Sequence, residues 1–88
     1  MNSQHRAIRI LLQEMGPRRA ENYIQAFDLR DDESMYIIER EVRRKSIQQI
    51  ASAHNVSAET VKRRRRSGFQ KIAEQINHSS TISAAMMQ

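Results

Sequence analysis

A run of five consecutive basic residues, Lys62 to Arg66, is the segment whose residue types could most readily do chemistry. Guanidinium and ammonium groups donate hydrogen bonds to phosphate oxygens and to the O6 and N7 atoms of guanine. Ala58 and Glu59 stand just before this run; a methyl group can contact the thymine methyl, and a carboxylate can accept a hydrogen bond from cytosine N4. These residue types therefore favour recognition of a nucleic acid.

Other kinds of chemistry find little support in the chain. It has no cysteine, which removes disulfides, thiol nucleophiles and thiolate zinc sites, and its histidines, His5, His54 and His78, are far apart in sequence. We recognise no nucleophile–base pair, carboxylate dyad or phosphate-cradling glycine loop. We therefore expect no catalytic residue, no metal and no cofactor, and a protein that is not an enzyme.

The net charge of +5 is unevenly distributed along the chain. Residues 1–39 hold five basic and seven acidic side chains, a net charge of −2, whereas residues 40–88 hold ten basic and three acidic ones, a net charge of +7. A basic block on a small domain is typical of proteins that bind nucleic acids, because neutralising phosphates releases condensed counterions. A solvated basic face is the simpler alternative.

The length of 88 residues indicates one small domain. A chain of this size buries roughly 60% of the surface that it exposes when unfolded, which excludes a large enzyme with a deep substrate cavity. No segment approaches the ~18 consecutive apolar residues of a membrane span, and residues 1–9 do not resemble a secretion signal. We expect a cytoplasmic, nucleoid-associated protein without a membrane partner.

Two amphipathic helices must lie ahead of the basic half, over Gln4–Met15 and Arg18–Phe27, because apolar residues recur there with helical spacing. Gly16 is placed to end the first helix and Pro17 to start the second. We expect this N-terminal unit, residues 1–28, either to complete the core or to form a dimer interface. The apolar positions are Ile8, Leu11, Leu12 and Met15, and then Ala20, Tyr23, Ile24 and Phe27.

A third helix is predicted after the acidic cluster Asp31–Glu33, whose charges suit the positive end of the helix dipole. It carries Met35, Ile38 and Val42 on one apolar stripe and ends in basic residues 43–45. Residues 77–88 show no clear stripe and are expected to form a flexible tail. Because no segment alternates apolar and polar residues, the fold class is all-α, with four to five short helices.

The segment that would position the basic run is Ser46–Ile76. Ser46 followed by Gln49 is a capping box, which predicts a short helix from Ile47, and Asn55 tolerates the left-handed conformation that a sharp turn needs. Ser57 is a second N-cap, from which a long helix runs to Ile76. A short capped helix, a tight turn and a second capped helix predict a helix-turn-helix within residues 29–76.

A helix-turn-helix presents the first turns of its second helix to the major groove of DNA. This geometry divides the polar residues into two sets of candidates. The predicted base-reading residues are Ala58, Glu59, Lys62, Arg63 and Arg66. The predicted phosphate-binding residues are Arg43, Arg44, Lys45, Ser57, Arg64, Arg65 and Lys71. Arg65 also interrupts the apolar stripe of the long helix, so its stem is expected to lie along the edge of the core.

The segment Leu29–Ile76 resembles region four of bacterial sigma factors and the small sigma-like regulators of phages and mobile elements. The resemblance lies in the opening L-x-x-x-E at Leu29, the core I-A-x-x-x-x-V-S-x-x-T-V-K from Ile50, and the basic helix ending in K-I at Lys71. The family's base-reading positions fall on Ala58, Glu59, Lys62 and Arg63. Asn55, His54 and Arg64 depart from the residues that are usual in the family.

The resemblance implies a prokaryotic or phage transcription regulator that binds double-stranded DNA. The chain has no room for the promoter-melting domain of a complete sigma factor, so we expect a stand-alone regulator. RNA polymerase and a second copy of the chain are further candidate partners. An alternative remains open: a protein-interaction module that binds RNA polymerase or another regulator and has only nonspecific affinity for nucleic acids.

Overall fold

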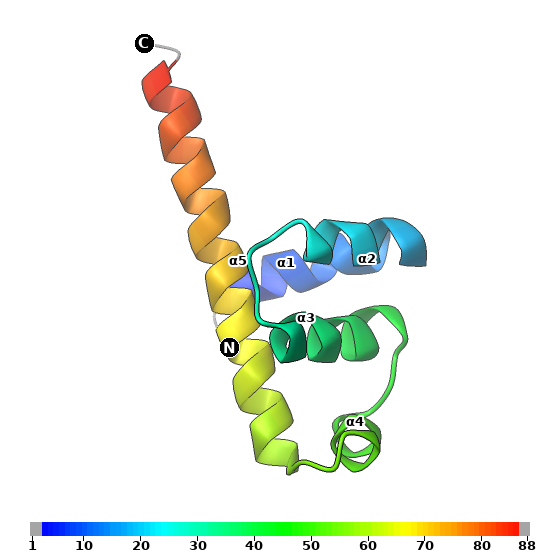
Figure 1. Cartoon of the computed structure of the whole chain (residues 1–88). Coiled ribbons are helices and arrows are strands. Elements are labelled where there is room, and N and C mark those ends of the chain that lie inside the picture. Colours follow the sequence, from blue (N-terminus) through cyan, green and yellow to red (C-terminus); the bar gives the residue numbers. More distant parts are fainter. Residues whose placement is uncertain (1–2, 87–88) are drawn as a thin grey trace.

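Five α-helices and one π-helical turn make up the fold in the computed structural model, which describes the backbone of residues 3–86 and the side chains of residues 3–78. The described residues contain no strand, so the all-α class is confirmed. The elements, in chain order, are α1 (Ser3–Glu14), α2 (Pro17–Gln25), α3 (Asp31–Ile37), the π-helical turn η1 (Ile38–Val42), α4 (Ile47–Ala53) and α5 (Ala58–Met86) (Figure 1).

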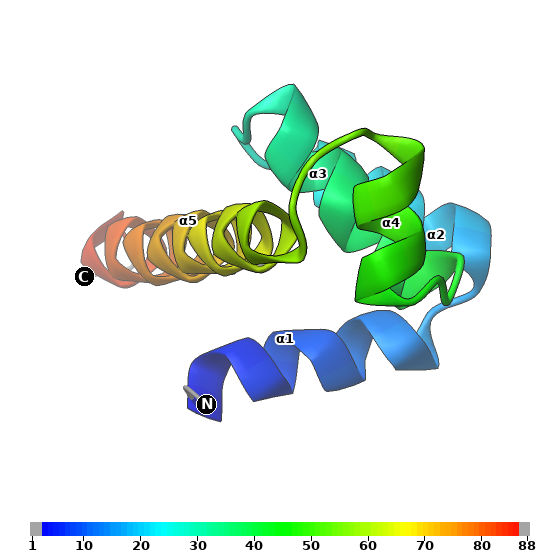
Figure 2. The same ribbon diagram turned by 90° about the horizontal axis from the view of Figure 1, so that it is seen from below.

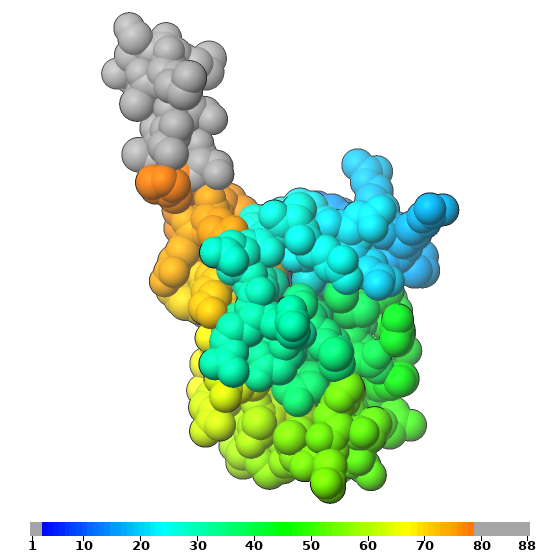
Figure 3. Space-filling view, viewed as in Figure 1, coloured from blue at the N-terminus to red at the C-terminus, as the bar shows by residue number. Residues whose placement is uncertain are grey.

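Helix α5 forms one side of the molecule. Helices α1, α3 and α4 lie against it, and α2 packs on α3 and η1 (Figures 1 and 2). Helices α3 and α4 follow one another along α5 toward its first residue, and α1 and α2 lie on the other side of α3. Figure 3 shows α2, α3 and α4 packed into one continuous surface in this view. The first turns of α5 therefore lie at the end of the molecule that carries α4.

Two apolar clusters hold the helices together. The larger cluster joins α1, α2, α3, η1 and α5, and the smaller one, Tyr36, Ile50, Ala51 and Val61, holds α4 against α3 and α5. Four residues of the larger cluster come from α1 and α2, so this helix pair contributes to the core. The larger cluster consists of Ile8, Leu12, Ala20, Ile24, Ile37, Ile38, Phe69, Ile72 and Ala73.

The connection between α1 and α2 differs from the prediction in one detail. Pro17 is the first residue of α2, as predicted. Gly16, however, has φ −64° and ψ 156° and is the N-cap of α2, so it does not end α1 in a left-handed conformation. Any residue can adopt this backbone conformation, and a Cβ added at Gly16 would meet nothing within 4 Å.

Helix α3 begins at the acidic cluster itself, with Asp31, Asp32 and Glu33 in its first turn. The predicted apolar stripe was wrong at Met35, which is 41% exposed, although Ile38 is buried and Val42 packs against the core. The buried face of α3 consists instead of Glu33, Tyr36 and Ile37. A charged residue thus occupies a core-facing position, which no hydrophobic pattern can reveal.

Glu33 is only 1% exposed, and each of its carboxylate oxygens is hydrogen-bonded. Its Oε1 accepts from the backbone N–H of Arg30 at 2.8 Å and from Lys71 Nζ at 2.9 Å, and its Oε2 accepts from Ser67 Oγ at 2.5 Å. Burial alone would raise the pKa of Glu33, but the hydrogen bonds from Ser67, Lys71 and Arg30 outweigh it and hold the pKa at about 2. Glu33 therefore fastens α3 to α5 as a buried anion.

Gly68 lets α3 approach α5 at this point. A Cβ on Gly68 would lie 2.7 Å from Ile37 Cδ1 and 3.3 Å from Glu33 Cβ. Ile37 is fully buried, so its side chain has little room to move. The absence of a side chain at position 68 thus sets how closely the two helices pack.

Helix α5 continues beyond the predicted end at Ile76 and runs to Met86. The flexible tail predicted over residues 77–88 falls mostly on residues whose side chains lie outside the described part, and its flexibility stays a prediction. None of the described helices combines the length and the apolar character that crossing a bilayer requires.

The buried Glu33 predicts an acid-sensitive fold. Its pKa is lower in the folded chain, so its contribution is complete above about pH 4.5 and is lost as the pH falls toward 2. The lowering of the pKa from 4.5 to about 2 corresponds to about 3 kcal/mol of unfolding free energy at neutral pH. Urea unfolding from pH 7 to pH 2 should show a Glu33→Gln deficit of this order that shrinks below pH 5. Glu14→Gln, at an exposed carboxylate, is the control; an equal deficit for Glu33→Gln at every pH would contradict the assignment.

The close contact at Gly68 predicts a second stability effect. Leucine favours helix more than glycine does, by about 1 kcal/mol, yet Gly68→Leu should lower the free energy of unfolding by about 2 kcal/mol or more because its side chain meets Ile37 and Glu33. Gly16→Ala, where the added Cβ has open space, should change stability by less than about 1 kcal/mol. A Gly68→Leu chain as stable as the parent in urea unfolding would show that α3 and α5 pack less closely.

Candidate nucleic-acid interface

The polar residues at the start of α5 share one exposed face. Glu59, Lys62, Arg63, Arg66 and Gln70 are all exposed and are spaced three or four residues apart in succession, apart from the adjacent pair 62 and 63. Lys62 Nζ lies 3.5 Å from Glu59 Oε1, an exposed pair that contributes little to stability. Four of the five predicted base-reading residues thus lie together in solvent, and Ala58, the fifth, is half-buried beside them.

The turn before α5 has the predicted local structure. Asn55 adopts φ 57°, in the left-handed region, directly after α4. Its backbone N–H donates to Ser52 O at 3.3 Å, and the N–H of Val56 donates to Ala51 O at 3.0 Å, so the carbonyls at the end of α4 are satisfied. Val56 packs against the small apolar cluster. The chain therefore changes direction sharply between α4 and α5, within four residues.

Both predicted helix caps around the turn are present. Ser46 Oγ accepts from the N–H of Gln49 at 3.1 Å, while the backbone N–H of Ser46 donates to Gln49 Oε1 at 2.8 Å. Ser57 Oγ accepts from the N–H of Thr60 at 3.1 Å. These short-range hydrogen bonds fix where α4 and α5 begin, and thereby which residues of α5 precede its first buried contact at Val61.

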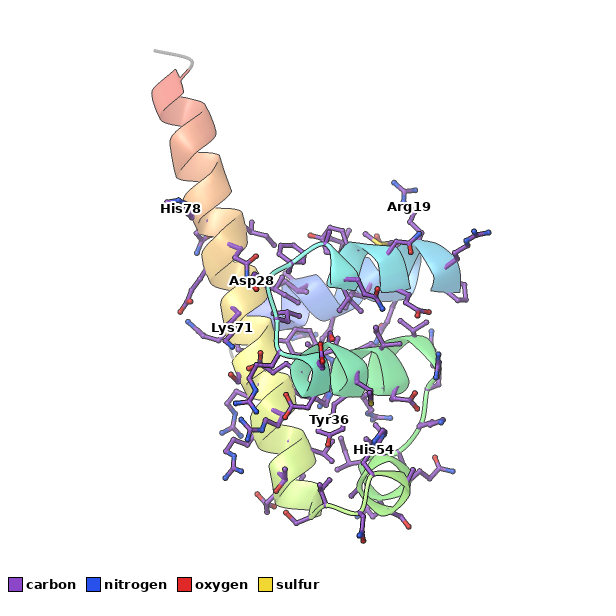
Figure 4. All side chains as sticks on the ribbon, viewed as in Figure 1. Arg19, Asp28, Tyr36, His54, Lys71 and His78 are labelled. Atoms are coloured by element: carbon purple, nitrogen blue, oxygen red, sulfur yellow. The ribbon has the colours of Figure 1, made fainter. Side chains whose placement is uncertain are left out.

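Tyr36 and His54 connect the turn to α3. Their ring centroids are 5.2 Å apart in an edge-on arrangement, and the labelled side chains face each other between α3 and α4 (Figure 4). Tyr36 is buried, whereas His54 is half-buried. His54 therefore serves as a packed corner residue and supports the position of α4.

The predicted phosphate-binding residues 43–45 follow a wide helical turn. The N–H of Arg43 donates to Ile38 O at 3.1 Å, a spacing of five residues, and Arg44 then adopts φ 61°. Arg43 Nη1 and Lys45 Nζ each lie 2.6 Å from an oxygen of the buried Glu39. The hydrogen bond from Lys45 is the largest cause that lowers the pKa of Glu39, against the opposing effect of burial. Arg44 is exposed and has no carboxylate partner among the described residues.

Three further predicted phosphate contacts are paired with acidic residues of α3 and η1. Arg64 Nε lies 3.2 Å from Asp32 Oδ2, and Lys71 Nζ lies 2.9 Å from Glu33 Oε1. Arg65 Nη2 donates to Glu41 Oε1 at 2.6 Å. These ion pairs connect α5 with α3 and η1. The three cations therefore lie to the side of the exposed face that carries Arg63 and Arg66.

Arg65 lies along the core edge, as its position in the apolar stripe predicted. Its side chain is 15% exposed, and its guanidinium carbon lies 5.7 Å from the ring centroid of Phe69. Burial lowers the pKa of Arg65, and the charge of Glu41 opposes that shift. Glu41 also accepts a hydrogen bond from Arg9 Nε at 2.9 Å and so joins α1, η1 and α5.

The pairing of these cations with Asp32, Glu33, Glu39 and Glu41 was missed by sequence reasoning. Sequence spacing offers one signal, since Glu33, Ile37 and Glu41 succeed one another at intervals of four residues on one helical face. A mixed apolar and acidic face opposite a basic helix is consistent with buried ion pairs between the two. The local pattern does not specify which basic residue each carboxylate meets.

The chain was compared with known proteins in three ways. No protein-family model matches it, and no curated protein or solved structure shows significant similarity to it.

Asn55 offers a direct check of the turn. Asn55→Gly should leave the unfolding free energy unchanged or slightly higher, because glycine adopts positive φ without strain. Asn55→Val should lower it by about 1–2 kcal/mol, because a β-branched residue resists φ 57°. Gln48→Val, at an exposed position within α4, is the matched control for the loss of an amide side chain. Equal stability of the two position-55 variants would place the strained residue elsewhere.

Proposed function

We propose that this chain is a sequence-specific DNA-binding transcription regulator of the sigma-like kind, in which α4, the turn and α5 form a helix-turn-helix. The observation that carries the proposal is the exposed face of α5. Lys62, Arg63 and Arg66 lie there, within the first turns of a helix that begins directly after a tight connection to α4. Of these, Arg63 and Arg66 have no carboxylate partner among the described residues. Such a face suits the major groove of B-DNA.

Each residue of this face has a role that its chemistry allows. Lys62, Arg63 and Arg66 would donate to guanine O6 and N7, and Glu59 would accept from cytosine N4. Ala58, at the first residue of α5, would contact a thymine methyl. Because cations on one exposed helical face repel one another, an anionic partner would relieve that repulsion and release counterions.

The proposed phosphate contacts come from residues that remain accessible. Arg44 is exposed, and Arg43 and Lys45 stay 53% and 44% exposed although both pair with Glu39. Ser57 at the start of α5 would add a contact from its hydroxyl or from the adjoining helix N-terminus, and Arg64 one from the flank of the helix. Arg65 and Lys71, which bind Glu41 and Glu33, are assigned a structural role instead.

The resemblance to sigma region four suggests that the regulator acts at promoters, where RNA polymerase would be a partner. Helices α1 and α2 contribute to the core, and Lys62, Arg63 and Arg66 stay exposed on α5. The proposal implies a protein of prokaryotic or phage origin that acts in the cytoplasm and is associated with the nucleoid.

Two single substitutions separate base reading from phosphate binding. Arg63→Ala should weaken binding to the preferred sequence by about 1–3 kcal/mol and relax the preference at one base position. Arg44→Ala should weaken binding to all sequences alike and lower the salt dependence of the affinity. Selection of binding sites from random duplex DNA at two salt concentrations, followed by titration of the selected site, measures both effects. Arg19→Ala, on an exposed side chain of α2 away from α5, is the matched control (Figure 4).

The same measurements can overturn the proposal. Equal losses on all sequences for both Arg63→Ala and Arg44→Ala would remove the base-reading role of Arg63. If the parent chain selects no sequence and releases DNA at moderate salt, while it retains RNA polymerase in a pull-down, it is an interaction module with nonspecific affinity for nucleic acids.

A further inference from the structure

A cavity of about 430 Å³ lies between α1 and α5. Arg9 lines it from α1, and Lys62, Arg65, Arg66 and Phe69 line it from α5. This volume falls within the range of small-ligand sites in proteins, which begins at about 300 Å³. From the sequence we expected this helix only to complete the core or to form a dimer interface, so a ligand site on it is a separate feature.

The walls of the cavity carry an excess of positive charge. Four cationic side chains line it, and the buried Glu41 compensates one of them, since its Oε1 is shared by Arg9 Nε and Arg65 Nη2. Lys62 lies 3.5 Å from Glu59, but that carboxylate is 85% exposed and is largely screened by solvent. The lining therefore carries a net positive charge, which attracts an anion into the cavity.

Two aromatic side chains line the cavity, and both are almost completely buried. Phe69 is buried, and its ring centroid lies 5.9 Å from that of His5, which also lines the cavity. The guanidinium of Arg65 lies over the same Phe69 ring. An inorganic anion would leave most of the volume of about 430 Å³ unfilled, whereas an organic group attached to the anion would occupy it.

We propose that this cavity binds a small organic phosphate of mononucleotide size. A phosphate monoester carries close to two negative charges at neutral pH, which suits the uncompensated charge of the walls better than a single carboxylate does. Guanidinium groups bind phosphate oxygens with paired hydrogen bonds, and the organic part of the ligand would occupy the rest of the cavity. Lys62 and Arg66 would close the phosphate end of the site.

Binding of this ligand has a regulatory consequence that rests on the proposed function. Lys62 and Arg66 belong both to the cavity and to the face of α5 proposed to read bases. When they contact a phosphate in the cavity, they are withdrawn from the DNA. The organic phosphate should therefore compete with DNA for the same protein molecules.

The site itself is tested without DNA, by calorimetric titration of the full chain with deoxyadenosine monophosphate, inorganic phosphate and deoxyadenosine. We expect saturable binding of the nucleotide with 1:1 stoichiometry, at least about tenfold weaker binding of inorganic phosphate, and no measurable binding of the nucleoside. Equal affinities for nucleotide and inorganic phosphate would reduce the site to a surface anion site and overturn the proposal. No binding of the nucleotide at millimolar concentration would overturn it as well.

A substitution at the rim locates the site. Gln70 lines the cavity, is exposed, and is within reach of His5, to which its Oε1 lies at 3.3 Å. Gln70→Glu adds a negative charge there without removing a core contact and should weaken nucleotide binding about fivefold or more. Gln48→Glu, at an exposed position of α4 outside the cavity, makes the same charge change and should leave the affinity unaltered. Equal effects of the two substitutions, in chains with unchanged thermal unfolding, would place the nucleotide elsewhere.

A final arm separates this proposal from the function on which its consequence rests. Nucleotide should displace a fluorescent duplex from the parent chain, and displacement should need more nucleotide with Gln70→Glu. If the chain binds nucleotide but no sequence of DNA, the proposed function fails and the cavity site stands. If it binds the duplex while nucleotide neither binds nor displaces it, the cavity proposal fails and the proposed function stands.

Discussion

The buried carboxylate of Glu33 is the constraint on which the arrangement of helices depends. An anion that is almost completely removed from water must be fully hydrogen-bonded, and its partners come from the start of α3 and from two positions on α5. The lack of a side chain at Gly68, between those two positions, allows the contact to form. Once α3 is fixed against α5, Tyr36 and Ile37 are placed to support both apolar clusters, and α4 takes its position from them.

Acidic residues of α3 and η1 determine which basic residues are held within the structure. Glu33, Glu39 and Glu41 each bind cations, and the residues they bind become parts of the structure. Cations that no carboxylate reaches, such as Arg63 and Arg66, stay on the surface. The carboxylates of α3 and η1 thus neutralise one side of the basic helix and leave its other side charged.

Local features of this fold were predictable, and distant ones were not. The capping box at Ser46, the cap at Ser57 and the positive φ of Asn55 involve groups at most three residues apart, so residue type alone specifies them. Glu33 and Lys71, in contrast, are 38 residues apart, and Met35 was assigned to the core because helical spacing cannot distinguish two neighbouring faces in so short a helix. The role of Arg65 was predicted only in part: its apolar position indicated the core edge, but its partner Glu41 requires the tertiary structure.

Helix α5 unites in one unbroken rod the residues that anchor the core and those proposed to read DNA. No hinge separates Arg63 from Phe69 or Ile72, so the exposed face is preorganised and little conformational entropy is lost when a partner binds. The same rigidity removes the means of adjusting to an imperfect groove. Adaptation would fall to the double helix, and sequences that widen or bend easily would be favoured even at base pairs that no side chain touches.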